Sequence, residues 1–483
     1  MDRTLTARPL KLDAHLDQGA PSWWFVEALA ADKTNGRQQL ESDIEVDVVI
    51  VGGGYTGLWT ALELAERDAG LKVALVEAGQ CGSQASGKNG GVVHGYWTGI
   101  AGVLSGFGHE DALAIADAGS LAQEAISTFC KRHADEVWWT EDGIVKGSTT
   151  PAQDAVLQHA VDAARALGRP DRAVPLSREE LQQRVRLPAF RQGVLFPEGA
   201  TVHPGRLARV LRREAIAGGT SVYEDTKVLA VTRESERYRL ITPRGSVRAR
   251  AVVLATNAAL AGLPQPRTYV TNFSSYAIMT EPAPEALAEH GWTGGEALLD
   301  SRMFLHYFRT TRDGRVLMGT GSGPIGYGAR LSRPLTRDSA SIERAISGLH
   351  FLLPAFRDVP IAGAWGGPID VSSDHLPQFA QLDGEQIFCA VGYSGHGVNA
   401  TWLGGQTLAS LVVGARDRWT DLPFVKRKPP RLPPEPLRYI GGRSIRAAIL
   451  ACERADQEGR RASAGARAVA SLPRLLGMRI GTR

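Results

Sequence analysis

The amino-acid sequence predicts an α/β fold built on a parallel sheet of the Rossmann type. Two observations lead to this prediction. Residues 45–77 contain a short apolar strand, a glycine-rich turn, a helix with apolar residues at helical spacing and a second apolar strand, which is the order of a βαβ unit. Residues 386–399 (QIFCAVGYSGHGVN) repeat the first half of that order near the other end of the chain. Both apolar runs are continuous rather than alternating, as expected of parallel strands that are buried on both faces.

Length and composition indicate a globular protein of two or three domains. The chain has 483 residues, of which 43% are hydrophobic and 22% charged, and domains typically contain ~100–200 residues. No run approaches the ~20 apolar residues that insert across a membrane, and the N-terminal residues, with Asp2, Asp13 and Asp17, do not form a secretory signal. The four cysteines include no CxxC pair, so we expect no disulfide framework, no metal site and a cytoplasmic location.

The first glycine-rich turn has the spacing of a dinucleotide-binding motif. The strand at residues 45–51 leads into residues 52–57 (GGGYTG), a G-x-G-x-x-G. Gly52 permits a tight turn, Gly54 lets a pyrophosphate approach the backbone, and Gly57 allows the helix at residues 58–68 to lie close to the strand. The N-terminus of that helix offers free N–H groups to phosphates. The strand at residues 71–76 ends at Glu77, whose carboxylate can accept hydrogen bonds from the ribose of an adenosine.

The segments that follow favour FAD over NAD. Residues 82–91 (GSQASGKNGG) are small and directly follow the second strand, where the chain can pass beneath an extended cofactor. The second glycine-rich loop aims another helix N-terminus, near residue 400, at the cofactor, which suits the negative charge that a reduced flavin gathers at N1 and O2. Further turns at strand ends are supplied by residues 221–232 and by the strand at residues 252–257, which ends at Thr256 and Asn257.

Charge is concentrated at the C-terminus. Residues 426–483 contain 14 Lys and Arg residues and four acidic ones. The tail lacks the interleaved aromatic residues that stack on bases, so we expect no nucleic-acid partner. Residues 429–436 (PPRLPPEP) indicate an extended strap and residues 444–457 a helix. We interpret the tail as structural.

Six segments together make the sequence resemble the D-amino-acid-oxidase-like superfamily of FAD-dependent oxidoreductases, with the gamma-glutamylputrescine oxidoreductase branch as the nearest. The resemblance extends over residues 20–425. The segments are VDVVIVGGGYTGLWTALELAE, VALVEAGQCGSQASGKNGG, VVLATNA, FLHYFRTTRDGRVLMGTG, WGGPIDVSSDHLPQF and VGYSGHGVNATWLGG. The resemblance implies a Rossmann-like FAD-binding domain interleaved with a substrate domain that contains an antiparallel sheet. The implied divisions are an N-terminal arm (1–41), FAD-binding parts (42–120, 196–265, 365–425), substrate parts (121–195, 266–364) and a basic C-terminal strap and helix (426–483).

The resemblance also implies which residues hold FAD. The pyrophosphate would lie on the first turn, the adenosine against Glu77, Ala78 and Val228, and the flavin between the two later loops. The loop at residues 86–91 (SGKNGG), here called the flavin loop, contains no His or Cys, so non-covalent FAD is expected. The implied cofactor residues are Gly52, Gly53, Gly54, Tyr55, Thr56, Gly57, Glu77, Ala78, Ser86, Gly87, Lys88, Asn89, Gly90, Gly91, Val228, Thr256, Asn257, Gly392, Gly395, His396, Gly397 and Val398.

One departure from the family pattern bears on the substrate. Oxidases of α-amino acids in this superfamily usually carry an Arg-Pro pair about five residues before an Asp, and the arginine clamps the substrate carboxylate. Aligned on Asp374, the corresponding pair here is Ile369-Asp370. A butyl side chain cannot replace a bidentate guanidinium. An amine or N-substituted amine is therefore the expected substrate.

Oxidation of a C–N bond requires hydride transfer from carbon to flavin N5 and a neutral amine nitrogen. A free alkyl amine has a pKa near ~10.4 and arrives protonated, so the site must remove that proton. The candidate catalytic residues are His396, Lys88, Tyr307 and Tyr276. In residues 304–308, Leu305, Tyr307 and Arg309 share one face and Phe304, His306 and Phe308 the other, and the sequence does not decide which face meets the flavin. For Arg309 a surface ion pair is expected, and for His306 a structural role.

Several alternatives stay open. The imine would hydrolyse, and the flavin would be reoxidised by O2 to hydrogen peroxide or, as the second choice, by an electron carrier. An alternative enzyme oxidises a secondary or N-methyl amino acid, with Arg302 or Arg309 in place of the missing clamp. An alternative of another class is a non-catalytic FAD-binding scaffold. The sequence does not determine the oligomeric state.

Overall fold

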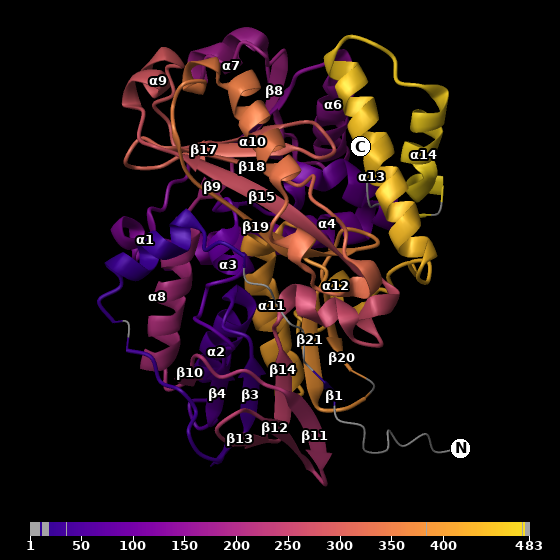
Figure 1. Cartoon of the computed structure of the whole chain (residues 1–483). Coiled ribbons are helices and arrows are strands. Elements are labelled where there is room, and N and C mark those ends of the chain that lie inside the picture. The colour runs from indigo at the N-terminus through magenta and orange to yellow at the C-terminus, as the bar shows by residue number, and fades with distance from the viewer. Residues whose placement is uncertain (1–9, 12–18, 35, 383, 476, 479–483) are drawn as a thin grey trace.

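The computed structural model describes residues 10–11, 19–34, 36–382, 384–475 and 477–478. Two large sheets dominate it, a six-stranded sheet in the lower half of Figure 1 and an eight-stranded sheet in the upper half. The expectation about a secretory signal concerns residues that lie mostly outside the described ranges. Among the described residues, no helix combines the length and the apolar character that a membrane span requires.

The six-stranded sheet contains the predicted βαβ unit. Its order is β10-β4-β3-β14-β21-β20, and all neighbours are parallel except the pair β20 and β21. The central strands are buried along their whole length, which explains their continuous apolar sequences. The strands are β3 (Val48–Val51), β4 (Val73–Val76), β10 (Ser221–Tyr223), β14 (Ala251–Leu254), β20 (Gln378–Gln381) and β21 (Ile387–Val391).

The eight-stranded sheet has the order β19-β15-β18-β17-β16-β6-β8-β7 and is antiparallel except where β16 pairs with β6. The mixed helix and sheet architecture predicted from the sequence is therefore confirmed. The strands are β6 (Ile144–Ser148), β7 (Val174–Leu176), β8 (Gln192–Phe196), β15 (Val270–Thr280), β16 (Ala297–Asp300), β17 (His306–Thr310), β18 (Val316–Thr320) and β19 (Ile361–Ser372).

Two smaller sheets complete the strands. A five-stranded sheet, β1-β11-β12-β13-β2, covers one face of the six-stranded sheet, and a two-stranded sheet pairs β5 with β9. Residues 45–51, expected to form one strand, are divided between β2 and β3. The strands are β1 (Leu10–Lys11), β2 (Ile44–Glu45), β5 (Val92–Val93), β9 (Ala200–Thr201), β11 (Ala230–Glu234), β12 (Arg237–Ile241) and β13 (Ser246–Ala249).

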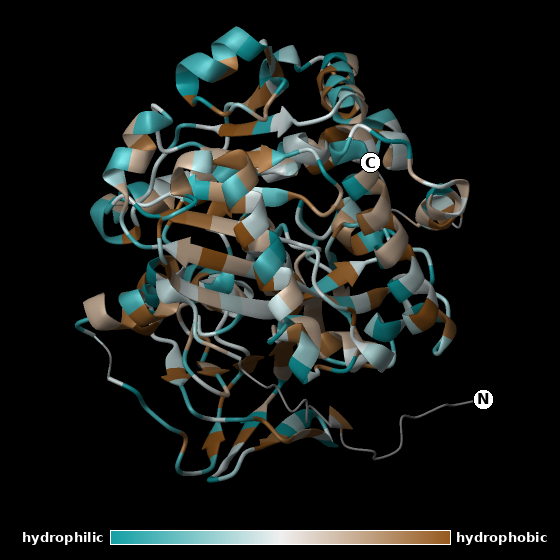
Figure 2. Ribbon diagram, turned by 45° about the horizontal axis from the view of Figure 1, so that its top comes forward, coloured by the Kyte–Doolittle hydropathy of each residue, from teal (hydrophilic) through white to brown (hydrophobic). Residues whose placement is uncertain are grey.

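Helices cover the remaining faces of both sheets. Helices α2 and α11 pack together on the six-stranded sheet, and α10 packs on the eight-stranded sheet. Figure 2 shows hydrophobic segments gathered in the strands and hydrophilic ones on the outer turns of the helices. The longer helices are α1 (Trp23–Ala31), α2 (Tyr55–Arg67), α4 (Ile100–Lys131), α6 (Pro151–Ala166), α8 (Pro204–Ala217), α10 (Ser339–Leu352) and α11 (Gly397–Val412). The shorter ones are α3 (Ala85–Lys88), α5 (Ala134–Val137), α7 (Arg178–Arg184), α9 (Pro284–Glu289) and α12 (Pro423–Lys426).

The C-terminal tail forms two helices that pack on each other, α13 (Leu437–Gln457) and α14 (Ala464–Leu475). They are the yellow helices at the right of Figure 1. Helix α13 begins seven residues before the predicted residue 444, directly after the proline-rich strap at residues 429–436.

Candidate active site and cofactor cavity

A cavity of about 1910 Å³ is lined by residues of both large sheets. At one end it is lined by Glu77, Ala78 and Val228. It continues past Gly54 and Ser86 and reaches side chains of the eight-stranded sheet and of the C-terminal helices. The glycine-rich turn, the flavin loop and the second glycine-rich loop, distant in sequence, therefore face one space.

The first glycine-rich turn has the geometry that a pyrophosphate site requires. Gly52 has φ +114°, a left-handed conformation that side chains disfavour. A Cβ at Gly57 would lie 2.0 Å from the carbonyl oxygen of Gly52, so only glycine lets α2 begin this close to β3. Gly54 precedes α2 and lines the cavity. The N-terminal N–H groups of α2 thereby face the cavity and favour an anion there.

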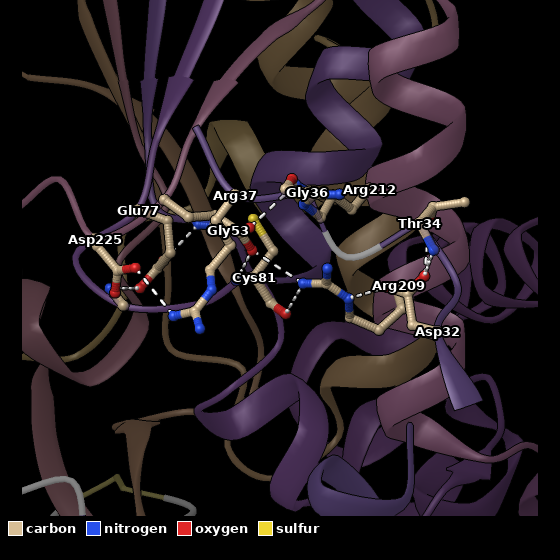
Figure 3. Close-up of polar contacts among 12 residues, drawn as sticks. Asp32, Thr34, Gly36, Arg37, Gly53, Glu77, Cys81, Arg209, Arg212 and Asp225 are labelled. Atoms are coloured by element: carbon tan, nitrogen blue, oxygen red, sulfur yellow. Dashed lines mark hydrogen bonds and ion pairs between the residues drawn. The ribbon is translucent and has the colours of Figure 1, made fainter. Parts of the chain in front are cut away.

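Glu77 is held by the backbone of the same turn. Its Oε2 accepts a hydrogen bond from Gly53 N at 2.7 Å and its Oε1 one from Gly79 N at 2.9 Å, and the Gly53 contact is visible in Figure 3. Burial raises the pKa of this carboxyl. Each oxygen retains a second lone pair, so Glu77 can accept the hydroxyls of a ribose from the cavity side.

A buried ion network supports the loop that follows Glu77. Glu224 Oε1 accepts from Cys81 N at 2.7 Å and from Arg209 Nη1 at 2.9 Å. Arg212 lies 3.1 Å from the other oxygen of Glu224, and Arg209 also pairs with Asp32 at 2.7 Å (Figure 3). Removing either arginine would leave the buried carboxylate of Glu224 with less compensation for its charge. Through Glu224, which also accepts from Cys81 N, the two arginines hold the loop that carries the adenosine side of the cavity.

The flavin loop presents four of its six residues to the cavity. Ser86, Lys88, Asn89 and Gly90 line it. Ser86 Oγ accepts from Tyr55 N at 2.9 Å and so joins this loop to the first turn. Gly87 and Gly91 instead face the protein interior, where a Cβ would lie 2.2 Å from the Gly82 carbonyl and 2.1 Å from the Val202 carbonyl, respectively.

The eight-stranded sheet turns the Tyr307 face of β17 toward the flavin loop. A Cβ at Gly90 would lie 2.7 Å from the Tyr307 ring, and the Tyr307 hydroxyl lies 3.1 Å from Ser275 Oγ. His306 faces the other side, where its Nδ1 lies 2.8 Å from the buried Asp300 carboxylate, as a structural histidine would. Of the two faces predicted for this strand, the one that carries Tyr307 is therefore the one that lies toward the flavin loop.

Two other candidates lie elsewhere. Tyr276 is buried outside the cavity lining, with its hydroxyl donating to the Pro334 carbonyl at 2.6 Å. Arg309 is also buried and does not form the expected surface ion pair. Its guanidinium donates to the carbonyls of Gly91 and Val202 at 3.2 and 2.7 Å, and burial lowers its pKa to about 9. Arg309 thus anchors the end of the flavin loop from behind.

The second glycine-rich loop brings a histidine cluster into the cavity. Gly395, His396, Gly397 and Val398 line the cavity at the start of α11. The ring centroid of His396 lies 5.5 Å from that of His94 and 6.5 Å from that of His375. The His396 side chain is exposed to the cavity, and the walls of the cavity enclose it. This desolvation, followed by the charges of His94, His375 and Lys146, lowers its pKa to about 3. His396 is therefore neutral at pH 7.

Asp370 supports the same loop. Its Oδ2 accepts from Gly392 N at 2.5 Å, while its backbone carbonyl accepts from Ser394 N at 2.8 Å. Burial raises the pKa of this carboxyl to about 7. Gly392 itself faces Ser372 rather than the cavity. The neighbouring Asp374 pairs with Arg427 at 2.8 Å.

We expect Asp370 to make stability depend on pH. Its pKa rises from 3.8 to about 7 on folding, so between these values the native state holds a proton that the unfolded chain has released. This stabilisation is complete below about 3.8 and is lost as the pH rises through about 7. Asp370→Asn removes the titration, so the melting temperature of the wild type should fall relative to the variant between pH 5 and 8. Parallel melting curves across this range would contradict the assignment.

The C-terminal helices line the cavity, a role that the sequence did not indicate. Leu437, Ile445, Arg446 and Ile449 of α13 contribute to the lining. The buried Glu453 accepts hydrogen bonds from Met303 N at 2.6 Å and Phe304 N at 3.2 Å. Both donor residues and the next residue, Leu305, line the cavity. In the sequence, the spacing of Ile445 and Ile449 predicts a helix with an apolar face, but this spacing does not identify the surface that the face covers.

We expect Glu453→Ala to loosen α13. The change leaves the two N–H groups without their acceptor, at a cost of about 1–3 kcal/mol. The melting temperature should fall, and limited proteolysis should cut residues 426–483 faster. Glu458→Ala is the matched control, because Glu458 is an exposed residue at the C-cap of the same helix. Equal proteolysis of both variants would show that Glu453 does not hold the helix.

The cavity fits FAD by its own features. The glycine turn leaves backbone N–H groups where a side chain would close the approach, and the Glu77 carboxylate lies beyond it. Near the middle of the cavity lining, Asn257 Oδ1 is buried and has no hydrogen-bond partner among the described residues. The expected cofactor residues that line the cavity are Gly52, Gly54, Tyr55, Thr56, Glu77, Ala78, Ser86, Lys88, Asn89, Gly90, Val228, Thr256, Asn257, Gly395, His396, Gly397 and Val398. Gly53, Gly57, Gly87, Gly91 and Gly392 shape the loops from outside the lining.

Comparison with known proteins agrees with this geometry. Residues 47–411 match the model of the family described as FAD dependent oxidoreductase. The chain is 30% identical over 429 residues to gamma-glutamylputrescine oxidoreductase of Escherichia coli (strain K12), covering 88% of this chain and 95% of that protein. It is also 30% identical over 414 residues to the probable oxidoreductase OrdL of Rhizobium meliloti (strain 1021), covering 84% and 90%, respectively.

A solved structure shows the same fold. Glycine oxidase from Geobacillus kaustophilus superposes with a TM-score of 0.66 at 22% sequence identity, covering 80% of this chain and 99% of that chain. The resemblance inferred from the six sequence segments is confirmed. The chain belongs to the DAO family of FAD-dependent oxidoreductases.

Proposed function

We propose that the protein oxidises the C–N bond of an amine to an imine, which water then hydrolyses. The observation that carries this proposal is the continuity of the cavity from the turn at Gly54 to the walls formed by Tyr307 and His396. Bound FAD would supply the acceptor for a hydride from the carbon next to nitrogen. In support, the names of two relatives, gamma-glutamylputrescine oxidoreductase and glycine oxidase, each state a substrate that carries an amino group.

The reacting group is the amine of a substrate without an α-carboxylate. Ile369 lines the cavity at the position expected for a clamping arginine and offers no hydrogen bond to a carboxylate. Such a substrate has a pKa near ~10.4 and enters protonated. It must become neutral before its nitrogen can stabilise the emerging positive charge.

His396 is the proposed acceptor of that proton. Its pKa of about 3 leaves the ring unprotonated at pH 7, and a base this weak does not retain a proton, so His396 would pass the proton from the ammonium group on to water. Tyr307 contributes an aromatic wall next to Gly90, and such a wall excludes water while still tolerating a cation over its face. Lys88 and Lys146 line the same cavity and disfavour a substrate that stays positively charged.

We propose O2 as the oxidant, with hydrogen peroxide as the product. Lys88 supports this choice, because its positive charge lies at the flavin loop, where it would favour the negative charge that O2 acquires on reduction. Stoichiometric formation of peroxide during turnover would support an oxidase. Turnover that requires a quinone or a dye would contradict it.

FAD is proposed to bind without a covalent bond. The flavin loop, residues 86–91, contains neither His nor Cys. The nearby Cys81 is fully buried beneath Gly53, and burial raises the pKa of its thiol, which leaves little reactive thiolate. Acid precipitation should release the flavin into the supernatant. Flavin that stays with the pellet would overturn this point.

The decisive experiment is the visible spectrum of the purified holoenzyme, recorded anaerobically before and after adding amines. Bleaching of the flavin bands by a primary or secondary amine supports the proposal. Flavin bands that no amine bleaches would favour a scaffold role. A protein that retains no flavin after reconstitution would contradict the use of this cavity for FAD.

A further inference from the structure

The cavity lining carries more cationic than acidic side chains. The cationic residues are Lys88, Lys146, Lys227, Arg302, Arg330, Arg438, Arg446 and Arg474, and the acidic ones are Glu77, Asp162, Asp370 and Asp374. Asp374 is already paired with Arg427, and burial raises the pKa of Asp370 to about 7. The pyrophosphate of bound FAD would neutralise only part of this excess, and an amine is itself a cation in water, so the excess indicates that the rest of the substrate is anionic.

Three arginines of the lining, Arg302, Arg438 and Arg446, are partly buried, and of these Arg446 on α13 is the least compensated by its neighbours. It donates from Nε and Nη2 to one carbonyl oxygen, that of Ser322, at 2.9 and 2.6 Å. Among the described residues no carboxylate lies within ion-pair distance of it. Asp338 is the acidic residue whose charge acts on Arg446, and it is itself paired with Arg344 at 3.7 Å. Burial, followed by the charge of Arg344, lowers the pKa of Arg446.

Arg330 and Arg474 of the lining are exposed, and the other two partly buried arginines differ from Arg446 in this respect. Arg302 pairs with Asp300 at 3.1 Å and donates to Gln457 at 3.1 Å. Arg438 donates to the Pro433 carbonyl at 2.9 Å and lies near Glu435, whose charge opposes the effect of burial on its pKa. Their charges are therefore partly used by the fold, whereas that of Arg446 is available to a ligand.

The eight-stranded sheet relates Arg446 to the flavin loop. The Tyr307 ring covers Gly319 of β18, since a Cβ there would lie 2.0 Å from it, and the same ring lies against Gly90. Ser322, the residue that Arg446 binds, follows Gly319 by three residues. Three residues span at most roughly 11 Å. The guanidinium is thus connected to the flavin loop through Ser322, β18 and the Tyr307 ring.

We propose that Arg446 binds a carboxylate at the far end of the substrate, so that the amine oxidised is one whose carboxylate is separated from the nitrogen by an aliphatic chain. This rests on the proposed function above. The apolar side chains of Ile445 and Ile449 line the cavity beside Arg446 and would contact that chain. The residue comes from α13, which lies outside the segment matched by the family model, residues 47–411.

The test uses the holoenzyme and two matched series of probes. The first is 4-aminobutanoate, 6-aminohexanoate, 8-aminooctanoate and the unreactive hexanoate, and the second is the n-alkylamines of the same lengths. Dissociation constants are measured by perturbation of the flavin absorbance and by calorimetry, and flavin reduction is followed anaerobically. Arg446→Gln is compared with Arg443→Gln, an exposed arginine three residues earlier on α13 that does not line the cavity.

We expect Arg446→Gln to weaken binding of the carboxylate series roughly 10- to 150-fold, the loss typical of a hydrogen bond to a charged group. Binding of the alkylamines should not weaken. Arg344 still donates to the Ser322 carbonyl at 3.1 Å, so the loop keeps a partner, and Arg446→Lys should restore part of the affinity.

Unchanged hexanoate binding in Arg446→Gln, or an equal loss in Arg443→Gln, would overturn the assignment. So would a wild type that binds no carboxylate probe. If the probes bind in the expected pattern but none bleaches the flavin, Arg446 keeps its role and amine oxidation is what fails.

Discussion

Gly57→Ala is expected to yield a protein that does not retain FAD. The added Cβ would lie 2.0 Å from the Gly52 carbonyl oxygen and 3.1 Å from the Ile50 side chain. Neither the backbone of the turn nor the buried strand β3 can yield at that distance, so α2 must shift away from β3. The N–H groups at the start of α2 would then no longer face the phosphate position, and a pyrophosphate would lose those donors.

The ratio of flavin to protein absorbance after purification measures this loss, and the melting temperature with and without added FAD measures its effect on stability. Binding of FAD stabilises the native state by mass action, so added FAD should raise the melting temperature of the wild type but not of Gly57→Ala. Gly465→Ala is the control, because that glycine lies inside α14 with nothing within 4 Å of the added Cβ. A Gly57→Ala protein that is yellow and responds to FAD would contradict the role given to this turn.

The features that the sequence predicted well are local ones. The turn at residues 52–57 is defined by glycine spacing, and both the positive φ of Gly52 and the contact of Gly57 with the Gly52 carbonyl are local to this turn. A Cβ at Gly52 would also lie 2.6 Å from the Ala255 carbonyl oxygen, a contact that the sequence does not reveal. The face of β17 that carries Tyr307 followed from strand alternation, although the choice between the two faces did not. That choice depends on Gly90 and Gly319, which pack on the Tyr307 ring from other elements.

The features that the sequence did not predict depend on contacts between distant segments. Tyr276 and Tyr307 both lie on apolar strands, but the ring of Tyr276 packs on Gly366 and its hydroxyl bonds Pro334, so it faces away from the cavity. Arg309 looks like a surface residue in the sequence, whereas two backbone carbonyls hold it in the interior. The position of α13 is fixed by Glu453 through Met303 and Phe304, about 150 residues earlier in the chain.

His396→Asn is expected to slow amine-dependent bleaching of the flavin by about 10²-fold, the lower end of the contribution of a general base, because its pKa lies well below pH 7. Asparagine has no nitrogen that accepts a proton from an ammonium group at pH 7. It is nevertheless suited to this position, because His396 is the residue that precedes α11 and makes no capping hydrogen bond with its side chain, and asparagine is among the preferred N-cap residues. The variant should therefore bind FAD and melt at or above the temperature of the wild type, which separates catalysis from folding.

His375→Asn provides the matched control, since His375 also lines the cavity and its φ of +62° is one that asparagine tolerates. If His396 is the base, this control should retain most of its rate, and if the three histidines act only through their combined charge, both variants should lose a similar amount. The pH profile separates the same alternatives. A pKa of about 3 for His396 means that protonation of this ring cannot produce an acid limb near pH 6.5 in kcat/KM. A limb near pH 6.5 that disappears in His396→Asn would show that His396 titrates normally and is not held neutral by its surroundings.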